Sequence, residues 1–421
     1  MFMDIRKIAI NGLFGEINHE IDLSDSISII MGDNGVGKTV ILSIIKAIYE
    51  DDFRTLLSFD FDKVVIWFKN RKDGRITYTK EGEDKIMIDS SSRDNETFEV
   101  SVDDVVVSTP SFVHEISPNK WIDMRSHMTL NLDELRQYYG SEIFEVSEDV
   151  LPDWYKRIFN NSKVHMIGTQ RLFQISYNGR KSVDLKVLAY SRQLSNYISQ
   201  ELSNAGKYAA ELDRTFPTRL VEQLKGNKKY ETDKLVCELE RLEQQRSSMS
   251  EVGFIDKIEE AIDVDAILNA NQDKTLLNVI RLYIKDSNRK IDKYQDAANK
   301  VSLFLRIINK RLSSKIVSVN TEKGFIVTSL KNRNRVIPTD RLSSGEQNEI
   351  VLFYDLIFNC DKCSLVLIDE PEISLHLEWL QQMLDDFKDI VKQNGMKMLI
   401  ATHSPDFVGD NYDLVQNLTY E

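Results

Sequence analysis

The chain has 421 residues, 42% of them hydrophobic, and a formal net charge of −13. This length suffices for two or three substructures, and the acidic balance argues against a surface that coats nucleic acid indiscriminately. The apolar runs are too short to span a membrane, and the N-terminus begins with a strand-like pattern in place of a signal peptide. Three cysteines give no disulfide framework, so we expect a cytoplasmic protein. Because the apolar runs are short, we expect no membrane partner.

The first informative element is a glycine-rich loop at residues 32–39, between an expected strand at 27–31 and an expected helix at 40–48. It fits the pattern G-x-x-x-x-G-K-[ST] at every fixed position. Glycines let the backbone turn its N–H groups around phosphate oxygens, and the threonine hydroxyl can bind Mg²⁺. We predict that Thr39 binds Mg²⁺. The residues predicted to bind the nucleotide are Gly32, Asp33, Asn34, Gly35, Val36, Gly37, Lys38, Thr39 and Val40.

Residues 52–115 alternate in the manner of β-strands, with runs at 64–68, 76–78 and 86–88 separated by polar turns. This pattern predicts an antiparallel sheet beside the nucleotide. Two basic clusters lie at expected hairpins, and each is either a solvated tip, which is the commoner case, or part of a DNA-binding groove. Their members are Lys69, Arg71, Lys72 and Arg75, and then Lys331, Arg333, Arg335 and Arg341.

Further along the chain, residues 164–172 read as a short strand that breaks into a loop, and this loop carries Gln170. The amide oxygen of Gln170 is a candidate ligand for Mg²⁺ and a candidate partner of the attacking water. Residues 186–312 then read as helical. Apolar residues from Leu277 to Leu312 recur in steps of three and four over about five heptads, roughly 55 Å, with Ser287 as the interruption. We expect one continuous seam there.

The helical segment 186–312 separates two expected lobes, 1–185 and 313–421. It is either a coiled-coil arm or a bundle packed on the body of the protein. After it, a hairpin at 315–328 leads into a small-residue turn at Leu342–Gln347 that opens a helix. Such a turn presents backbone N–H groups and a hydroxyl to an anion, which makes Ser343 and Gly345 candidate nucleotide contacts.

An apolar strand at 365–368 ends in two carboxylates, Asp369 and Glu370. Ligands bind at the carboxyl ends of such buried parallel strands, so we predict that Asp369 holds Mg²⁺ beside Thr39 and that Glu370 polarises the attacking water. Glu372 is interpreted as an acid in the first turn of the next helix. His403, at the tip of the following strand, is placed to contact the γ-phosphate.

The segments GDNGVGKT, IGTQRL, LSSGEQ, LVLIDEPEISLH and ATHSP together resemble the ABC-type, OLD-like branch of AAA ATPases, which is related to the SMC and recombination-repair ATPases. The resemblance covers residues 1–50 and about 315–408. It implies an α/β fold, an ABC-type P-loop ATPase head with a mixed sheet and an inserted helical arm. It also implies ATP and Mg²⁺ as cofactors, hydrolysis to ADP and phosphate, and catalytic roles for Glu370, His403 and Gln170.

In that family the ATPase pairs head to tail and sandwiches two ATP molecules. The resemblance therefore implies a homodimer or a higher oligomer, in which Ser343 and Gly345 contact the γ-phosphate held by the opposite Lys38. The loop Ser374-Leu375-His376 would cross the dimer interface.

Stand-alone relatives resemble the ATPase subunits of anti-phage systems such as Septu, PARIS and retron-linked modules. There the ATPase works with a separately encoded nuclease or toxin. We expect the same here, without a fused Toprim nuclease. The alternatives are an SMC-like DNA-repair or DNA-clamp ATPase, which would need a basic groove, and a scaffold that binds ATP without hydrolysing it.

Overall fold

The structure, a computed structural model, describes residues 5–69, 74–91, 96–117, 120–139, 143–146, 150–159, 163–177, 181–225, 232–255, 274–332, 335–360, 364–373 and 375–420. Four residues named above lie outside these ranges: Arg71, Lys72, Arg333 and Ser374. The chain divides into two compact units, one of residues 1–186 and 354–421 and the other of residues 187–353.

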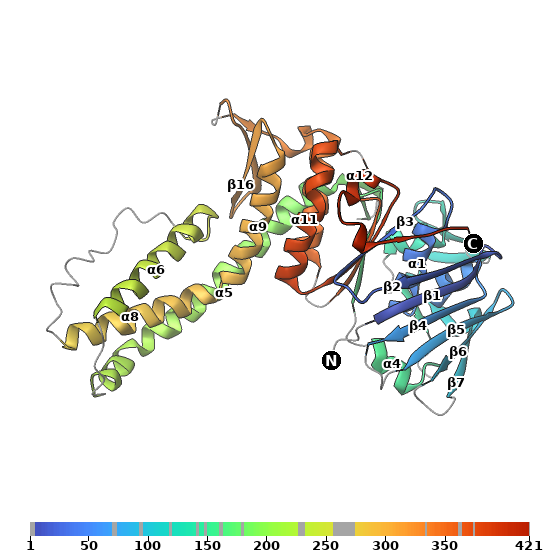
Figure 1. Cartoon of the computed structure of the whole chain (residues 1–421), viewed down its shortest axis with the longest axis horizontal. Coiled ribbons are helices and arrows are strands. Elements are labelled where there is room, and N and C mark those ends of the chain that lie inside the picture. Colours follow the sequence, from blue (N-terminus) through green and yellow to red (C-terminus); the bar gives the residue numbers. More distant parts are fainter. Residues whose placement is uncertain are drawn as a thin grey trace. The chain divides into compact units, whose positions relative to one another are not determined.

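The first unit contains a six-stranded antiparallel sheet with the order β2-β1-β4-β5-β6-β7 (Figure 1). Its buried positions alternate with exposed ones, most regularly in β2, as expected for a sheet with one face toward a core. The predicted antiparallel sheet is therefore present. Its strands are β1 (Ile5–Leu13), β2 (Ile17–Asp22), β4 (Lys63–Phe68), β5 (Arg75–Glu81), β6 (Lys85–Ser90) and β7 (Thr97–Ser101).

A second sheet in the same unit is parallel throughout and has the order β13-β19-β20-β3-β21. Every residue of its β19 strand is buried, which explains why that strand reads as a continuous apolar run. Because the strands are parallel, the segments after β3, β13, β19 and β20 leave the sheet at one edge. Its strands are β3 (Ile27–Met31), β13 (Val164–Ile167), β19 (Leu365–Asp369), β20 (Lys397–Thr402) and β21 (Val415–Asn417).

Helix α1 (Lys38–Tyr49) contributes to one hydrophobic core with residues of both sheets. Most of its length is buried, because isoleucine and leucine occupy several of its faces. The other α-helices and strands that the structure describes in this unit are α2 (Phe53–Ser58), β8 (Val105–Val107), β9 (Val113–Ser117), β10 (Lys120–Asp123), β11 (Met128–Asn131), α3 (Leu132–Tyr139), β12 (Phe144–Val146), α4 (Asp153–Phe159), β14 (Phe173–Tyr177), β15 (Lys181–Leu185), α11 (Leu377–Asn394) and α12 (Pro405–Val408).

Asp51, just after α1, gives a prediction about stability. Its backbone has a positive φ of 53°, and burial raises the pKa of its carboxyl from 3.8 to about 6 against the opposing hydrogen bond from Tyr155. Between pH 3.8 and about pH 6, the Asp51 carboxyl is protonated in the folded state and ionised in the unfolded state. The free energy of unfolding therefore falls as the pH rises from 3.8 to about 6. We expect Asp51→Asn to raise the free energy of unfolding by about 3 kcal/mol at pH 8, because asparagine carries no charge to bury.

Asparagine suits this substitution because it tolerates positive φ and still accepts a hydrogen bond. Urea unfolding at several pH values measures the effect, which should shrink steadily below pH 6 and approach zero near pH 4. The exposed Asp60→Asn is the matched control. An Asp51→Asn protein that is less stable than the unsubstituted chain at pH 8 contradicts this account.

The second unit consists of helices and a small sheet ordered β16-β17-β18. Helices α5 and α8 lie side by side (Figure 1), joined by an ion pair between Arg219 and Asp286. Helix α6 packs on α8, where Arg246 donates a hydrogen bond to the Tyr283 hydroxyl at 2.9 Å. The elements are α5 (Lys186–Lys225), α6 (Thr232–Glu251), α8 (Lys274–Asp292), α9 (Gln295–Arg311), β16 (Lys315–Asn320), β17 (Gly324–Ser329), β18 (Val336–Ile337) and α10 (Ser344–Tyr354).

The predicted continuous seam from Leu277 to Leu312 is wrong in one respect. The helix breaks between Asp292 and Gln295, so that α8 and α9 are separate elements. Periodicity alone does not detect this break, because the apolar spacing continues through a turn that contains neither glycine nor proline. Among the described residues, no helix has the length and apolar content that a membrane span requires.

The predicted fold class, an α/β P-loop ATPase head with a helical insertion, is confirmed by these elements. The boundary between the compact units falls at residues 353 and 354, near the end of α10. The segment 313–421, expected as one lobe, is therefore shared between the two units. Its hairpin at 315–328 and the turn at Leu342–Gln347, called the signature turn below, cluster with the helices. The strand that ends in Asp369 and Glu370, called the carboxylate strand, clusters with the glycine-rich loop at residues 32–39, called the phosphate loop.

Candidate active site

The phosphate loop joins β3 to α1 through glycines in left-handed backbone. Gly37 caps α1 with φ of 95°, and a Cβ there would lie 2.6 Å from Cδ2 of Leu13. Gly35 has φ of 93°. Residues with side chains rarely adopt this conformation. The loop therefore keeps its curled shape, which turns backbone N–H groups inward, only with glycine at these positions.

Lys38 lies inside the loop and is only 6% exposed. Its ammonium donates hydrogen bonds to the carbonyl oxygens of Gly32, at 2.7 Å, and Asp33, at 3.0 Å. A buried ammonium needs such acceptors. The positive charge is thus held at the first turn of α1, where the helix dipole also favours an anion.

Thr39 and Asp369 meet although 330 residues separate them. The Thr39 hydroxyl donates a hydrogen bond of 2.9 Å to Oδ2 of Asp369. The other oxygen, Oδ1, is buried and accepts no hydrogen bond from the residues that the structure describes. Burial raises the pKa of Asp369, against the opposing effects of Thr39 and Lys38. A hydroxyl beside a carboxylate with a spare buried oxygen fits Mg²⁺, which prefers oxygen ligands.

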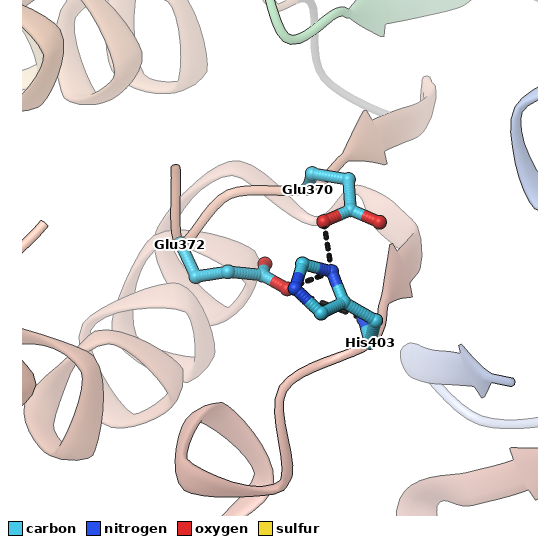
Figure 2. A group of neighbouring side chains, drawn as sticks. All are labelled: Glu370, Glu372 and His403. Carbon is cyan, nitrogen blue, oxygen red and sulfur yellow. Dashed lines mark hydrogen bonds and ion pairs between the residues drawn. The ribbon is translucent and has the colours of Figure 1, made fainter. Parts of the chain in front are cut away.

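Glu370 follows directly and has an unusual backbone. Its φ of 48° is rare for a residue with a long side chain, and such strain clusters at functional sites. Burial and then the charge of Glu372 raise the pKa of Glu370. Its carboxylate contacts Nδ1 of His403 (Figure 2), so that an acidic group and an imidazole stand together beyond the ends of two neighbouring strands.

Arg171 is a residue that the sequence reasoning did not single out. Its side chain is buried, and Nη2 donates to the main-chain oxygens of Glu370, at 3.0 Å, and Pro371, at 3.2 Å. It thereby helps to fix the strained turn that carries Glu370. The available signal was a basic residue directly after Gln170 in the loop that follows β13. Gln170 itself is exposed.

The interpretation of Glu372 as a helix-opening acid is wrong. The next helix, α11, begins five residues later, at Leu377. Glu372 lies instead in the turn after β19, where it is 8% exposed. Its Oε1 accepts hydrogen bonds from the Thr402 hydroxyl and, at 3.2 Å, from the backbone N–H of His403. Glu372 therefore ties the turn after β19 to the tip of β20.

The signature turn belongs to the second compact unit and has its own polar network. Exposed Ser343 donates to Oε2 of Glu346 through its N–H, at 2.9 Å, and its hydroxyl, at 3.0 Å. This arrangement caps α10, whose first turn also contains Gly345. Lys315 donates to both oxygens of Glu346, at 2.5 and 2.8 Å. Burial opposes ionisation of Glu346, but hydrogen bonds from Lys315 and Ser343 outweigh it and lower its pKa.

The sequence-predicted residues thus gather in two places. The phosphate loop, Asp369, Glu370 and His403 stand at the carboxyl edge of the parallel sheet, and Gln170 follows β13 at that same edge. Ser343 and Gly345 stand at the start of α10 in the other unit. The first group combines a loop for phosphates, a cation and a carboxylate that could position water. These are the parts that phosphoryl transfer to water requires.

Curated proteins are similar to about a quarter of the chain. The chain is 32% identical over 117 residues to an uncharacterised ABC transporter ATP-binding protein of Mycobacterium tuberculosis, covering 26% of this chain and 45% of that protein. It is 30% identical over 124 residues to the phosphonates import ATP-binding protein PhnC of Mycoplasma capricolum, covering 27% and 48%. The chain therefore spans less than half the length of these relatives.

Solved structures give a weaker similarity. An SMC head domain from Thermotoga maritima aligns with 99% of this chain and 95% of its own length, at 11% identity and a TM-score of 0.36. A similarity at this level does not identify a function.

The profile of the family described as "AAA ATPase domain" matches residues 3–408. The match runs from β1 to the end of α12 and so includes the phosphate loop, the signature turn, the carboxylate strand and His403. The chain therefore belongs to the AAA ATPase domain family.

Proposed function

We propose that the protein binds ATP with Mg²⁺ and hydrolyses it to ADP and phosphate. The observation that carries this proposal is the 2.9 Å hydrogen bond between Thr39 and Asp369, which brings the phosphate loop to the carboxylate strand. In the proposed roles, Lys38 neutralises the outer phosphates and Thr39 and Asp369 hold Mg²⁺. Glu370 polarises water and His403 contacts the γ-phosphate, while Gln170 is a further Mg²⁺ or water contact.

We also propose that the protein acts as a head-to-tail dimer or a higher oligomer. Ser343 is exposed at the start of α10, and an exposed helix start that carries a hydroxyl suits an anion. Lys315 neutralises the Glu346 carboxylate beside it, which lowers the repulsion that an approaching phosphate would meet. These features support a signature turn that caps ATP held by another copy of the chain.

We further propose that the protein is a sensor, which passes a displacement of its helices to the signature turn and controls a separate effector. Arg311, at the end of α9, forms a buried ion pair of 2.7 Å with Glu349 of α10. Both side chains are at most 2% exposed, and breaking a buried pair is costly. This contact and the Lys315 pair would transmit a displacement of the helices to Ser343. We propose a separately encoded nuclease or toxin as the effector that this ATPase controls.

Mixing two inactive variants tests the pairing. Lys38→Ala and Ser343→Arg chains should each fail to hydrolyse ATP on their own, because the first binds ATP poorly and the second cannot cap it. In a mixed dimer, one site combines the intact Lys38 of one chain with the intact Ser343 of the other. Mixing equal amounts of the two chains should therefore restore up to about half of the original ATPase rate, since each mixed dimer has one intact site of two. Phosphate release measures this, and differently tagged chains show that mixing occurred. Mixed dimers without any recovery would contradict capping between copies.

A further inference from the structure

Three side chains that can bind metal ions meet beyond the ends of β19 and β20. One donor atom from each of Glu370, Glu372 and His403 lies within 4.8 Å of the others. Nδ1 of His403 contacts Oε2 of Glu370 and lies 3.5 Å from Oε1 of Glu372. Figure 2 shows both carboxylates turned toward the same imidazole ring. The cluster thus offers one nitrogen and two carboxylate groups around a small volume.

Glu372 gives a second and independent indication of a cation. Its side chain is only 7% exposed. Oε1 accepts hydrogen bonds from Thr402 and from the backbone of His403, whereas Oε2 is buried and accepts none from the residues that the structure describes. A buried carboxylate oxygen without a donor is costly. A cation bound to that carboxylate would remove the cost and also the repulsion between the two acids.

We propose that Glu370, Glu372 and His403 form a site for a borderline-soft divalent cation of the Zn²⁺ class. An imidazole nitrogen with carboxylate oxygens is a donor set that suits Zn²⁺, whereas Mg²⁺ prefers oxygen alone. This site is separate from the proposed Mg²⁺ site, which uses Thr39 and Asp369.

The spacing fits such an ion after small rotations of the side chains. Donors around a tetrahedral Zn²⁺, with bonds of about 2.1 Å, are separated by roughly 3.4 Å. The His403–Glu372 separation of 3.5 Å already matches this value. The His403 side chain is 49% exposed, which gives the ion an entry path from solvent. Water would supply the fourth ligand of such an ion.

Occupation of this site has a consequence for turnover, and this consequence rests on the proposed function. Glu370 and His403 are the groups proposed to act on water and on the γ-phosphate. When a cation binds Glu370 and His403, these side chains cannot act on water or on the γ-phosphate. Zn²⁺ is therefore expected to inhibit ATP hydrolysis without displacing ATP. Binding itself is independent of the proposed function, because it is measured on the nucleotide-free chain.

Co²⁺ is the probe that tests the site. Added to the metal-stripped, nucleotide-free full chain, it should give visible absorption bands that saturate at one ion per chain and disappear when Zn²⁺ is added. Glu372→Gln should weaken Co²⁺ binding at least tenfold, because Gln keeps the acceptor for Thr402 and loses the anionic ligand. Exposed Glu378→Gln on α11, the matched control, should bind as the unsubstituted chain does.

Two further variants keep the proposal open to refutation. His403→Ala removes the half-exposed nitrogen ligand with little packing and should abolish the bands. Asp369→Asn alters the proposed Mg²⁺ site and should leave them in place. Co²⁺ binding that is equally strong in Glu372→Gln and Glu378→Gln overturns the proposal. The proposal is also overturned if Asp369→Asn abolishes Co²⁺ binding and His403→Ala retains it.

Discussion

Lys38→Ala is expected to weaken ATP binding by at least about 100-fold, because it removes the one ammonium held inside the phosphate loop. In the structure this ammonium bonds to the carbonyl oxygens of Gly32 and Asp33. It would exchange these acceptors for phosphate oxygens when ATP binds. Titration of a fluorescent ATP analogue, or calorimetry with ATP and Mg²⁺, measures the loss directly.

Lys46→Ala is the matched control, since Lys46 lies on the same helix and forms only a partly exposed ion pair with Glu50. It should bind ATP as the unsubstituted protein does. Circular dichroism should show that both variants keep their helix content. An unchanged affinity in Lys38→Ala would refute the assignment of the phosphate loop.

Glu370→Gln is expected to lower the rate of ATP hydrolysis by about 10²–10³-fold while leaving ATP bound. Glutamine keeps the shape of the side chain and can still contact His403, but it cannot accept a proton from water. The strained backbone at Glu370, fixed by Arg171 and by a 2.9 Å hydrogen bond to the carbonyl of Ala401, should remain in place. Single-turnover hydrolysis separates this chemical step from binding.

The control for this substitution is Glu378→Gln, which neutralises an exposed acid of α11 and should leave turnover unchanged. If Glu370→Gln hydrolyses ATP at the original rate, Glu370 does not activate the water. The role would then pass to another group at the edge of the parallel sheet.

The sequence predicted much of the sheet edge because simple rules connect pattern to topology. A continuous apolar run at 365–368 indicates a strand covered on both faces. Parallel strands bring their carboxyl ends to one edge. From these rules Thr39 and Asp369, 330 residues apart, are expected to be neighbours, and the structure joins them by a hydrogen bond. The glycine pattern likewise anticipated the left-handed turns at Gly35 and Gly37.

Other features depend on contacts that no local pattern encodes. Arg171 supports the turn at Glu370 across 199 residues, and its neighbours in sequence give no sign of that partner. Glu372 looked like a helix-opening acid because a helix was expected nearby, but its hydrogen-bond partners lie on β20. The break between α8 and α9 was also missed, since apolar spacing persists across it. Such features follow from tertiary packing.

The central claim is that ATP joins two copies of this chain through the signature turn. The most direct measurement is the mass of Glu370→Gln in solution, by light scattering, with and without ATP and Mg²⁺. We predict twice the chain mass of 48.7 kDa with ATP and a single chain without it. Adding Ser343→Arg to the same protein should abolish the dimer while ATP still binds. A mass that does not change when ATP is added, or a dimer that persists with Ser343→Arg, would contradict the claim that ATP joins two copies through the signature turn.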